Sequence, residues 1–126
     1  KEVSQDQVNA AFAKVYDEYA KSLILDGATN YTVKSGDTLS AITTEKYGNG
    51  KGYYFPVIML ASSDVVLDPD LIQPGMVLKV PNLEKNLKDP VAKGKLKDFF
   101  KEISNVYKKK GNATVQEKLL EISKSL

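Results

Sequence analysis

Two short segments with strand composition, 31–33 and 76–80, limit the folds open to this chain. The first is Tyr-Thr-Val, after which Lys34 leads into a Ser-Gly pair, and the second ends at Pro81. β-Branched and aromatic residues favour strands, whereas Gly and Pro interrupt them. Pro74 and Gly75 precede the second segment and are typical of a type II turn, in which Pro fixes φ and Gly takes a positive φ. We therefore expect two short strands, each next to a tight turn.

Two helix patterns lie between these strands. Asp37 precedes an apolar stripe and is expected to cap a helix that runs to about Lys46. The glycine-rich stretch 47–52 predicts a loop, and a second helix is expected over 53–62, where Pro56 is tolerated in the first turn. The order strand, helix, helix, strand places the two strands to pair antiparallel. The fold class that follows is α+β, a βααβ module with a two-stranded antiparallel sheet.

Amphipathic helices are expected on both sides of this module. On the N-terminal side, Ser4 and Gln7 have the form of a capping box, and apolar residues recur at helical spacing over 5–25. Asp26 and Gly27 should end that helix, because Gly readily takes the left-handed conformation of a helix C-terminus. The residues 28–30 are then expected to form a connector.

Two further helices are expected on the C-terminal side. Asp89 followed by Pro90 predicts the start of a helix that continues to about Lys110. Thr114 with Glu117 predicts a capping box for the last helix. These patterns divide the chain into three parts, as follows: an N-terminal flanking helix (1–30), the central module (31–83) and a C-terminal helical extension (84–126).

The amino-acid inventory removes several classes of chemistry. The chain has no Cys and no His, so a thiol nucleophile, a disulfide and a thiolate zinc site are impossible, and the side chain that most often transfers protons near pH 7 is missing. Every basic residue is Lys, which lacks the planar fork that reads phosphate and guanine, so we expect no nucleic-acid partner. No apolar run approaches the roughly 18 residues of a membrane span.

Cofactors and metals are not expected. Asp68 and Asp70 lie two residues apart and are interpreted as the start of a turn, because calcium takes about six to eight oxygen ligands. The glycines around Lys51 lack the Gly-Lys-Ser/Thr ending of a phosphate-binding loop. The sequence begins at Lys1 rather than Met, so we expect a mature form or part of a longer protein.

The two ends of the central module resemble a lysin motif (LysM). The opening segment 31–42 reads Tyr-Thr-Val-Lys-Ser-Gly-Asp-Thr-Leu-Ser-Ala-Ile, and the closing segment 70–81 reads Asp-Leu-Ile-Gln-Pro-Gly-Met-Val-Leu-Lys-Val-Pro. The longer middle is similar to an extended-loop variant known in bacteria, which in some cases belongs to a potassium-binding protein. The absence of Cys is also more like the bacterial members.

The resemblance implies binding of N-acetylglucosamine-containing chains, such as peptidoglycan or chitin, in a shallow groove between two loops. By position, the groove residues are Gly36, Asp37, Thr38 and Leu39 in the first loop, and Leu71, Ile72, Gln73 and Pro74 in the second. An N-acetyl sugar carries an amide that needs hydrogen bonds and a methyl group that needs a small apolar contact, so two such loops suit it. We expect weak affinity for each sugar unit, strengthened by long glycans.

At two positions the chain differs from the family pattern. Gln73 stands where many members have an aromatic or bulky residue before Pro-Gly, and Ser62 stands where many have Asn. The first change removes a stacking surface for a sugar. The aromatic run 53–55 is interpreted either as a stacking platform or as part of the core.

Three functional hypotheses remain open. The main hypothesis is a non-catalytic glycan-binding protein that anchors to peptidoglycan in the cell envelope, in the periplasm or outside the cell. The alternative is a protein-interaction scaffold that has lost sugar binding and recruits a protein partner through its flanking helices. The third is an ion or ligand sensor whose glycine-rich loop orders on binding. An enzyme is not expected, because carboxylates such as Asp37 and Glu45 lie in a small module without a deep cleft.

Overall fold

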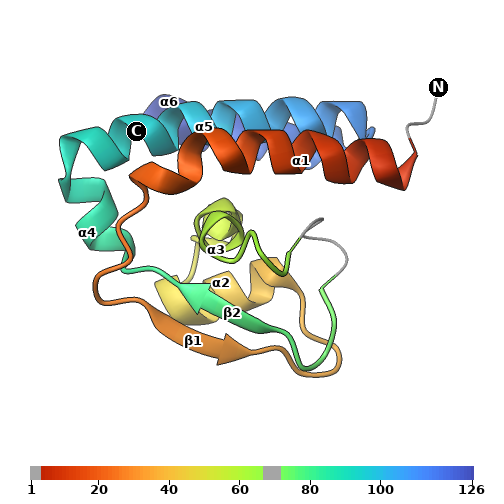
Figure 1. The fold of residues 1–126 in the computed structure, drawn as a ribbon. Helices are drawn as coiled ribbons and strands as arrows, with labels where there is room; N and C mark the ends of the chain where they lie inside the picture. The colour runs from red at the N-terminus through yellow and green to blue at the C-terminus, as the bar shows by residue number, and fades with distance from the viewer. Residues whose placement is uncertain (1–3, 67–71) are drawn as a thin grey trace.

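The computed structural model of the chain describes residues 4–66 and 72–126, and it places a small sheet beneath two layers of helices (Figure 1). The elements in chain order are α1 (Gln5–Tyr19), the 3-10 helix η1 (Ala20–Ser22), β1 (Thr29–Thr32), α2 (Leu39–Tyr47), the 3-10 helix η2 (Gly52–Tyr54), α3 (Phe55–Ala61), β2 (Val77–Val80), α4 (Leu83–Lys88), α5 (Pro90–Lys109) and α6 (Ala113–Ser125). The predicted α+β class and the βααβ order are confirmed.

The sheet consists of β1 and β2 paired antiparallel, as predicted, with Thr29 opposite Val80 and Thr32 opposite Val77. β2 begins one residue later than expected. β1 begins two residues earlier than expected, so the predicted connector at 28–30 is wrong at its last two positions. Asn30 has low strand propensity and separates Thr29 from the predicted strand, but Lys79 and Val80 of β2 supply the ladder partners of Asn30 and Thr29, so pairing outweighs the local preference of Asn30.

The module helices follow the predicted order with different ends. The hydroxyl of Thr38 accepts a hydrogen bond from the backbone N–H of Ala41 at 3.3 Å and caps α2, so the prediction that Asp37 caps this helix is wrong. α3 begins at Phe55, after the 3-10 turn, and has Pro56 in its first turn as expected. The close approach of this 3-10 turn to α2 requires Gly at position 52, because a Cβ there would lie 2.8 Å from Oγ1 of Thr44.

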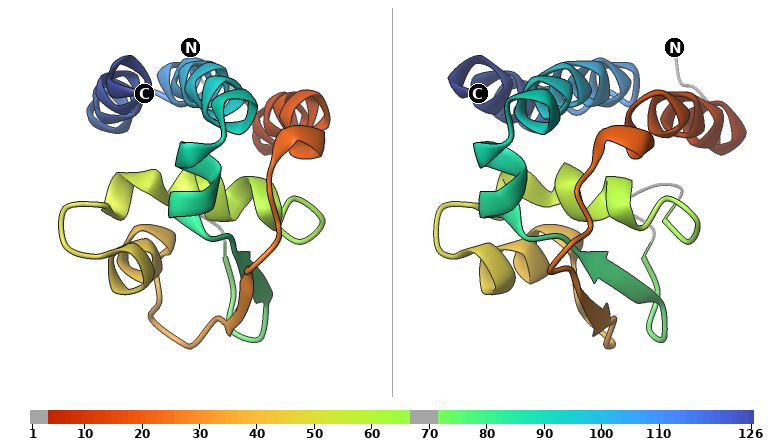
Figure 2. Two further views of the ribbon diagram at one scale, coloured as in Figure 1. Left: turned by 90° about the vertical axis from the view of Figure 1, so that its left-hand side faces the viewer. Right: turned by 60° about the vertical axis from the view of Figure 1, so that its left-hand side comes forward.

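α1, α5 and α6 lie side by side in one layer, with α5 in the middle (Figure 2). The capping box of α1 is confirmed, and Asp89 caps α5 by accepting hydrogen bonds from the N–H groups of Val91 and Ala92. α6 starts one residue before Thr114, and its cap is Asn112, so the predicted capping box is wrong. The last two helices are otherwise where the apolar spacing predicts them.

α4 was not predicted, and it explains why α1 ends early. The helix expected over 5–25 stops at Ser22. The buried amide of Asn86 in α4 accepts a hydrogen bond from Ile24 N–H at 2.8 Å and donates one to Ile24 C=O at 3.0 Å. Because both backbone groups of Ile24 are satisfied by this side chain, neither is available to extend the helix.

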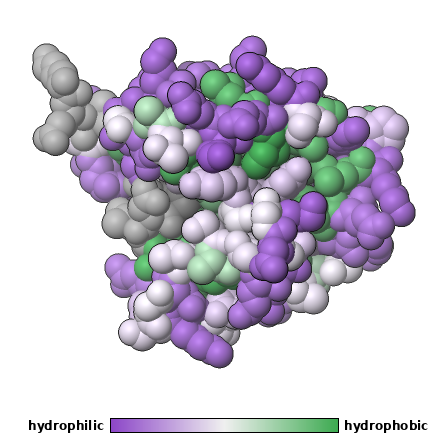
Figure 3. Space-filling model, turned by 180° about the vertical axis from the view of Figure 1, so that it is seen from behind, coloured by the Kyte–Doolittle hydropathy of each residue, from purple (hydrophilic) through white to green (hydrophobic). Residues whose placement is uncertain are grey.

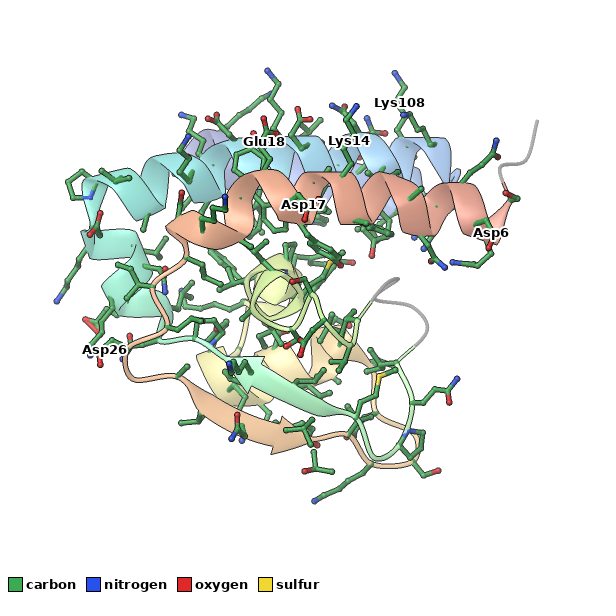
Figure 4. The ribbon with its side chains drawn as sticks, in the orientation of Figure 1. Asp6, Lys14, Asp17, Glu18, Asp26 and Lys108 are labelled. Atoms are coloured by element: carbon green, nitrogen blue, oxygen red, sulfur yellow. The ribbon has the colours of Figure 1, made fainter. Side chains whose placement is uncertain are left out.

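The core lies between the helical layer and α3. Val57, Ile58 and Met59 of α3 are fully buried, as are Phe12 of α1 and Phe99 of α5. Polar side chains cover the outer side of the layer, where Lys14, Glu18 and Lys108 point away from the sheet (Figure 4). Seen from behind, hydrophilic groups dominate the helical part of the surface (Figure 3). The flanking helices and the module therefore share one apolar core.

Candidate functional site

The loop between β1 and α2 is held by the carboxylate of Asp37. Oδ2 of Asp37 accepts a hydrogen bond from the phenol of Tyr31 at 2.7 Å and another from the backbone N–H of Lys34 at 2.8 Å. Asp37 N–H also donates to the carbonyl of Lys34 at 3.1 Å and closes the turn. Gly36 has a φ of 85°, a left-handed conformation that Gly adopts readily. The loop is thus shaped before any ligand arrives.

These hydrogen bonds change the acid–base properties of both partners. The hydrogen bond from Tyr31, followed by that from Lys34 N–H, holds the pKa of Asp37 below its ordinary value. The same bond to Asp37 raises the pKa of Tyr31 to about 12. The ammonium of Lys46 lies 5.0 Å from the centre of the Tyr31 ring. Asp37 is therefore ionised at neutral pH and serves as an acceptor inside the loop, which does not suit a general acid.

The turn before β2 lies directly against this loop. Met76 N–H donates to the carbonyl of Gln73 at 3.2 Å, and Gly75 has a φ of 95°, which fits the predicted type II turn with Pro74. Val33 N–H donates to Met76 C=O at 2.8 Å, and Gly75 N–H donates to Val33 C=O at 2.9 Å. Backbone hydrogen bonds therefore join the two predicted loops at the end of the sheet.

A pocket of about 230 Å³ opens beside these loops. Its lining residues are Asp37, Thr38, Leu39, Ser40, Tyr53, Phe55, Ile72, Tyr107 and Val115. Of the residues predicted for a glycan site, four line this pocket. Gly36, Gln73 and Pro74 belong to the loops but not to the lining, and Leu71 lies outside the described residues, as do Asp68 and Asp70.

The pocket has the chemistry of a binding site for an uncharged polar ligand. Thr38 and Ser40 are exposed and offer hydroxyl groups, while Leu39 is buried and Ile72 is half-buried. Asp37 is the titratable acid in the lining, and its acceptor capacity is already used in part. Within 4–66 and 72–126, no cluster of three or more His, Cys, Asp or Glu residues is placed to hold a metal ion. The arrangement favours hydrogen bonding and apolar contact.

The aromatic run 53–55 divides between the two roles considered for it. Phe55 is buried and packs edge-on against the ring of Tyr107, with 6.0 Å between centroids. Tyr54 packs in the same manner on Phe100 at 5.9 Å. Tyr53 is half-buried and lines the pocket. Phe55 also lines the pocket, so Tyr53 and Phe55 both belong to the site, and Tyr53 is the more exposed of the two.

Sequence reasoning missed three lining residues, Ser40, Tyr107 and Val115. Ser40 directly follows Leu39, the last residue predicted for the first loop, so a prediction extended by one residue would have included it. Tyr107 and Val115 come from α5 and α6, which the sequence predicted only as amphipathic flanking helices. Spacing shows which face of a helix is buried but not which loop that face meets.

A second, larger depression of about 510 Å³ lies near the other end of α2. It is lined by Gly27, Thr29, Lys46, Tyr47, Lys51, Val80, Pro81, Asn82, Leu83, Glu84 and Leu87. The phenol of Tyr47 donates to Pro81 C=O at 2.8 Å, and burial raises the pKa of this phenol. None of the residues predicted for the glycan site lies here, so the smaller pocket is the better candidate despite its size.

Comparison with known families and proteins supports the resemblance seen in the sequence. Residues 31–81 match the family model described as LysM domain. No solved structure matches the chain. LysM domains as a family bind peptidoglycan and related glycans, are typically non-catalytic, and are usually extracellular or associated with the cell envelope. Among residues 4–66 and 72–126, no helix combines the length and the apolar character that crossing a membrane requires.

Two relatives show the same similarity over part of their length. The chain is 40% identical over 72 residues to the "Potassium binding protein Kbp" of Escherichia coli O6:H1, which covers 57% of this chain and 47% of that protein. It is 44% identical over 55 residues to an uncharacterized protein of Deinococcus radiodurans, which covers 44% of this chain and 20% of the relative. The matched stretches thus span less than half of each relative.

Proposed function

We propose that this chain, which contains a LysM domain at residues 31–81, binds N-acetylglucosamine-containing glycan in the pocket beside the β1–α2 loop. One observation carries the proposal. The LysM match coincides with a fold in which Val33 and Gly75 join the two predicted loops, and residues from both loops line one pocket. We further propose peptidoglycan as the partner, with the protein anchored to it in the cell envelope, in the periplasm or outside the cell.

The chemistry of the pocket fits an N-acetyl sugar. Hydroxyl groups of Thr38 and Ser40 can exchange hydrogen bonds with sugar hydroxyls and with the acetamido group. Leu39, Ile72 and Tyr53 offer apolar surface for the acetyl methyl group and for a ring face. Since the pocket is small, affinity for one sugar should be weak and should increase with glycan length.

Binding should be measured with the full chain and N-acetylglucosamine oligomers of increasing length, observed by amide NMR. Shifts are expected at Asp37, Thr38, Leu39 and Ser40, together with retention on purified peptidoglycan. Glucose oligomers of equal length are the matched control, because they lack the acetamido group and should cause no such shifts. Absence of both retention and shifts would remove the proposal. Release of soluble sugar fragments during incubation would contradict the non-catalytic part.

Potassium binding is the second candidate. It is suggested by the name of the Escherichia coli relative and by a matched stretch of 72 residues, which is longer than the LysM segment. A ligand that binds only the folded state raises the melting temperature. If this function is present, melting in KCl should exceed melting in NaCl at equal ionic strength. Equal melting temperatures in the two salts would argue against it.

A further inference from the structure

Part of the candidate pocket is built by residues outside the LysM segment. Tyr107, near the end of α5, is 1% exposed and places its ring against Phe55. Val115, in the first turn of α6, is half-buried and lines the pocket on the side of the C-terminal helices. The pocket of the LysM domain is therefore completed by the helical extension.

Hydrogen bonds at both ends of α6 hold this helix, and with it Val115, in place. Val115 N–H donates to the side chain of Asn112 at 3.2 Å, and Asn112 N–H donates to Tyr107 C=O at 3.0 Å. At the other end, the hydroxyl of Ser123 donates to the carbonyl of Lys97 on α5 at 2.7 Å. These bonds, with the fully buried Leu119 between them, hold α6 against α5. Val115 is thus a preorganised wall, which lowers the entropic penalty of ligand contact.

Of the described residues in the second predicted loop, Ile72 lines the pocket, whereas Gln73 and Pro74 do not. Gln73, which stands where many LysM domains have a bulky residue, is exposed and does not line the pocket. We infer that Val115 of α6 contacts the bound glycan in its place and determines the size of the group that the pocket accepts. This inference rests on the proposed glycan binding. The group concerned is the acetyl methyl group or an apolar ring face, since those are the parts of an N-acetyl sugar that an aliphatic wall accommodates.

The test compares Val115→Trp with Val91→Trp in the full chain. Val91 lies on α5, is 68% exposed and is not among the pocket residues, so its variant is a control with the same change of side chain. Titration with N-acetylglucosamine tetramer should show binding at least about tenfold weaker for Val115→Trp and unchanged for Val91→Trp. In the unmodified protein, the Val115 amide signal should shift together with those of Thr38 and Leu39.

Circular dichroism and melting will show whether the larger side chain of Val115→Trp disturbs folding. If it does, Val115→Ala provides the test instead. It removes methyl groups from the contact and leaves the α6 backbone in place, so binding should weaken severalfold. Two results together would overturn the inference and leave glycan binding intact: native affinity in Val115→Ala and, in the unmodified protein, tetramer-induced shifts at Thr38 but none at Val115. No binding by the unmodified protein would overturn both. The two failures are therefore distinguishable.

Discussion

Asp37 shows at the scale of a residue how a carboxylate can shape a binding loop. Helix capping was its expected role, yet Thr38 caps the helix and Asp37 accepts two hydrogen bonds within the loop. A carboxylate with two donors is strongly favoured in its ionised form. The loop should therefore keep its shape at any pH at which Asp37 is charged.

Removal of the phenol donor by Tyr31→Phe should raise the pKa of Asp37 toward its ordinary value, because the hydrogen bond from Tyr31 is the largest cause of the lowering. A lowered pKa contributes stability that is present above the unfolded value of about 4 and is lost as the pH falls through the folded value. Unfolding of the variant should thus depend less on pH below about 4 than that of the native protein.

Carboxyl NMR titration of Asp37 checks this prediction directly. Tyr54→Phe is the control, because Tyr54 packs on Phe100 and is not among the groups that shift the pKa of Asp37. If Tyr31→Phe and Tyr54→Phe leave the pKa of Asp37 equally low, the hydrogen bond does not have the effect assigned to it.

Gly36 provides the second prediction at this scale. Its φ of 85° strains any side chain, although the surrounding space is open. Gly36→Ala should reduce the free energy of unfolding by about 1–2 kcal/mol. Gly94→Ala is the matched control, since Gly94 is exposed within α5 and alanine there should add about 0.5–1 kcal/mol. Urea denaturation of both variants would test the opposite signs, and a stabilised Gly36→Ala would be incompatible with the loop conformation described.

At the scale of elements, α4 is hydrogen-bonded through Asn86 to Ile24, in the segment between η1 and β1. Asn86 is fully buried, and its side-chain amide donates to the carbonyls of Ile24 and Asn82 and accepts from Ile24 N–H. A six-residue helix has little intrinsic stability. Its place is therefore set by these hydrogen bonds and by burial of Leu83.

Asn86→Ala should destabilise the protein by about 1–3 kcal/mol, because two part-buried backbone groups of Ile24 lose the hydrogen-bond partner that Asn86 supplies. Asn105→Ala, at an exposed position of α5, should change stability by less than about 0.5 kcal/mol. Chemical denaturation measures both changes. Equal effects at the two positions would show that the Asn86 network contributes nothing.

At the scale of the whole molecule, residues 4–66 and 72–126 build an apolar core from the module and from the flanking helices. Phe12 of α1, Phe55 of α3 and Tyr107 of α5 form part of it, with the Tyr107 ring 5.9 Å from Phe12 and 6.0 Å from Phe55. The division into segments 1–30, 31–83 and 84–126 stays a prediction about how the chain is organised. Elements that share a core lose their contacts together.

Thermal unfolding should therefore follow a single transition, with the same midpoint by far-UV circular dichroism and by NMR signals of the module and of α6. Phe99→Ala, which removes a ring from the centre of the helical layer, should lower the stability of the whole chain by about 3–5 kcal/mol and shift every probe together. Melting of α6 signals ahead of those of β1 and β2 would contradict one cooperative unit.

The sequence alone was sufficient for features with local causes. Asp89 with Pro90 predicted the start of α5, Ser4 with Gln7 predicted the cap of α1, and Pro74 with Gly75 predicted the turn before β2. Such signals depend on backbone geometry and hydrogen bonds within a few residues. The motif order added the βααβ topology, because two short strands separated by helices pair with each other.

Tertiary structure decided what depends on distant partners. The early end of α1 results from the hydrogen bonds between Asn86 and Ile24, and the start of β1 results from its pairing with β2. Thr38 caps α2 because the carboxylate of Asp37 accepts hydrogen bonds from Tyr31 and Lys34 instead. Tyr107 and Val115 reach the pocket only because α5 and α6 fold back over the module. Sequence periodicity specifies that an apolar face must be covered, but packing of the whole chain determines what covers it.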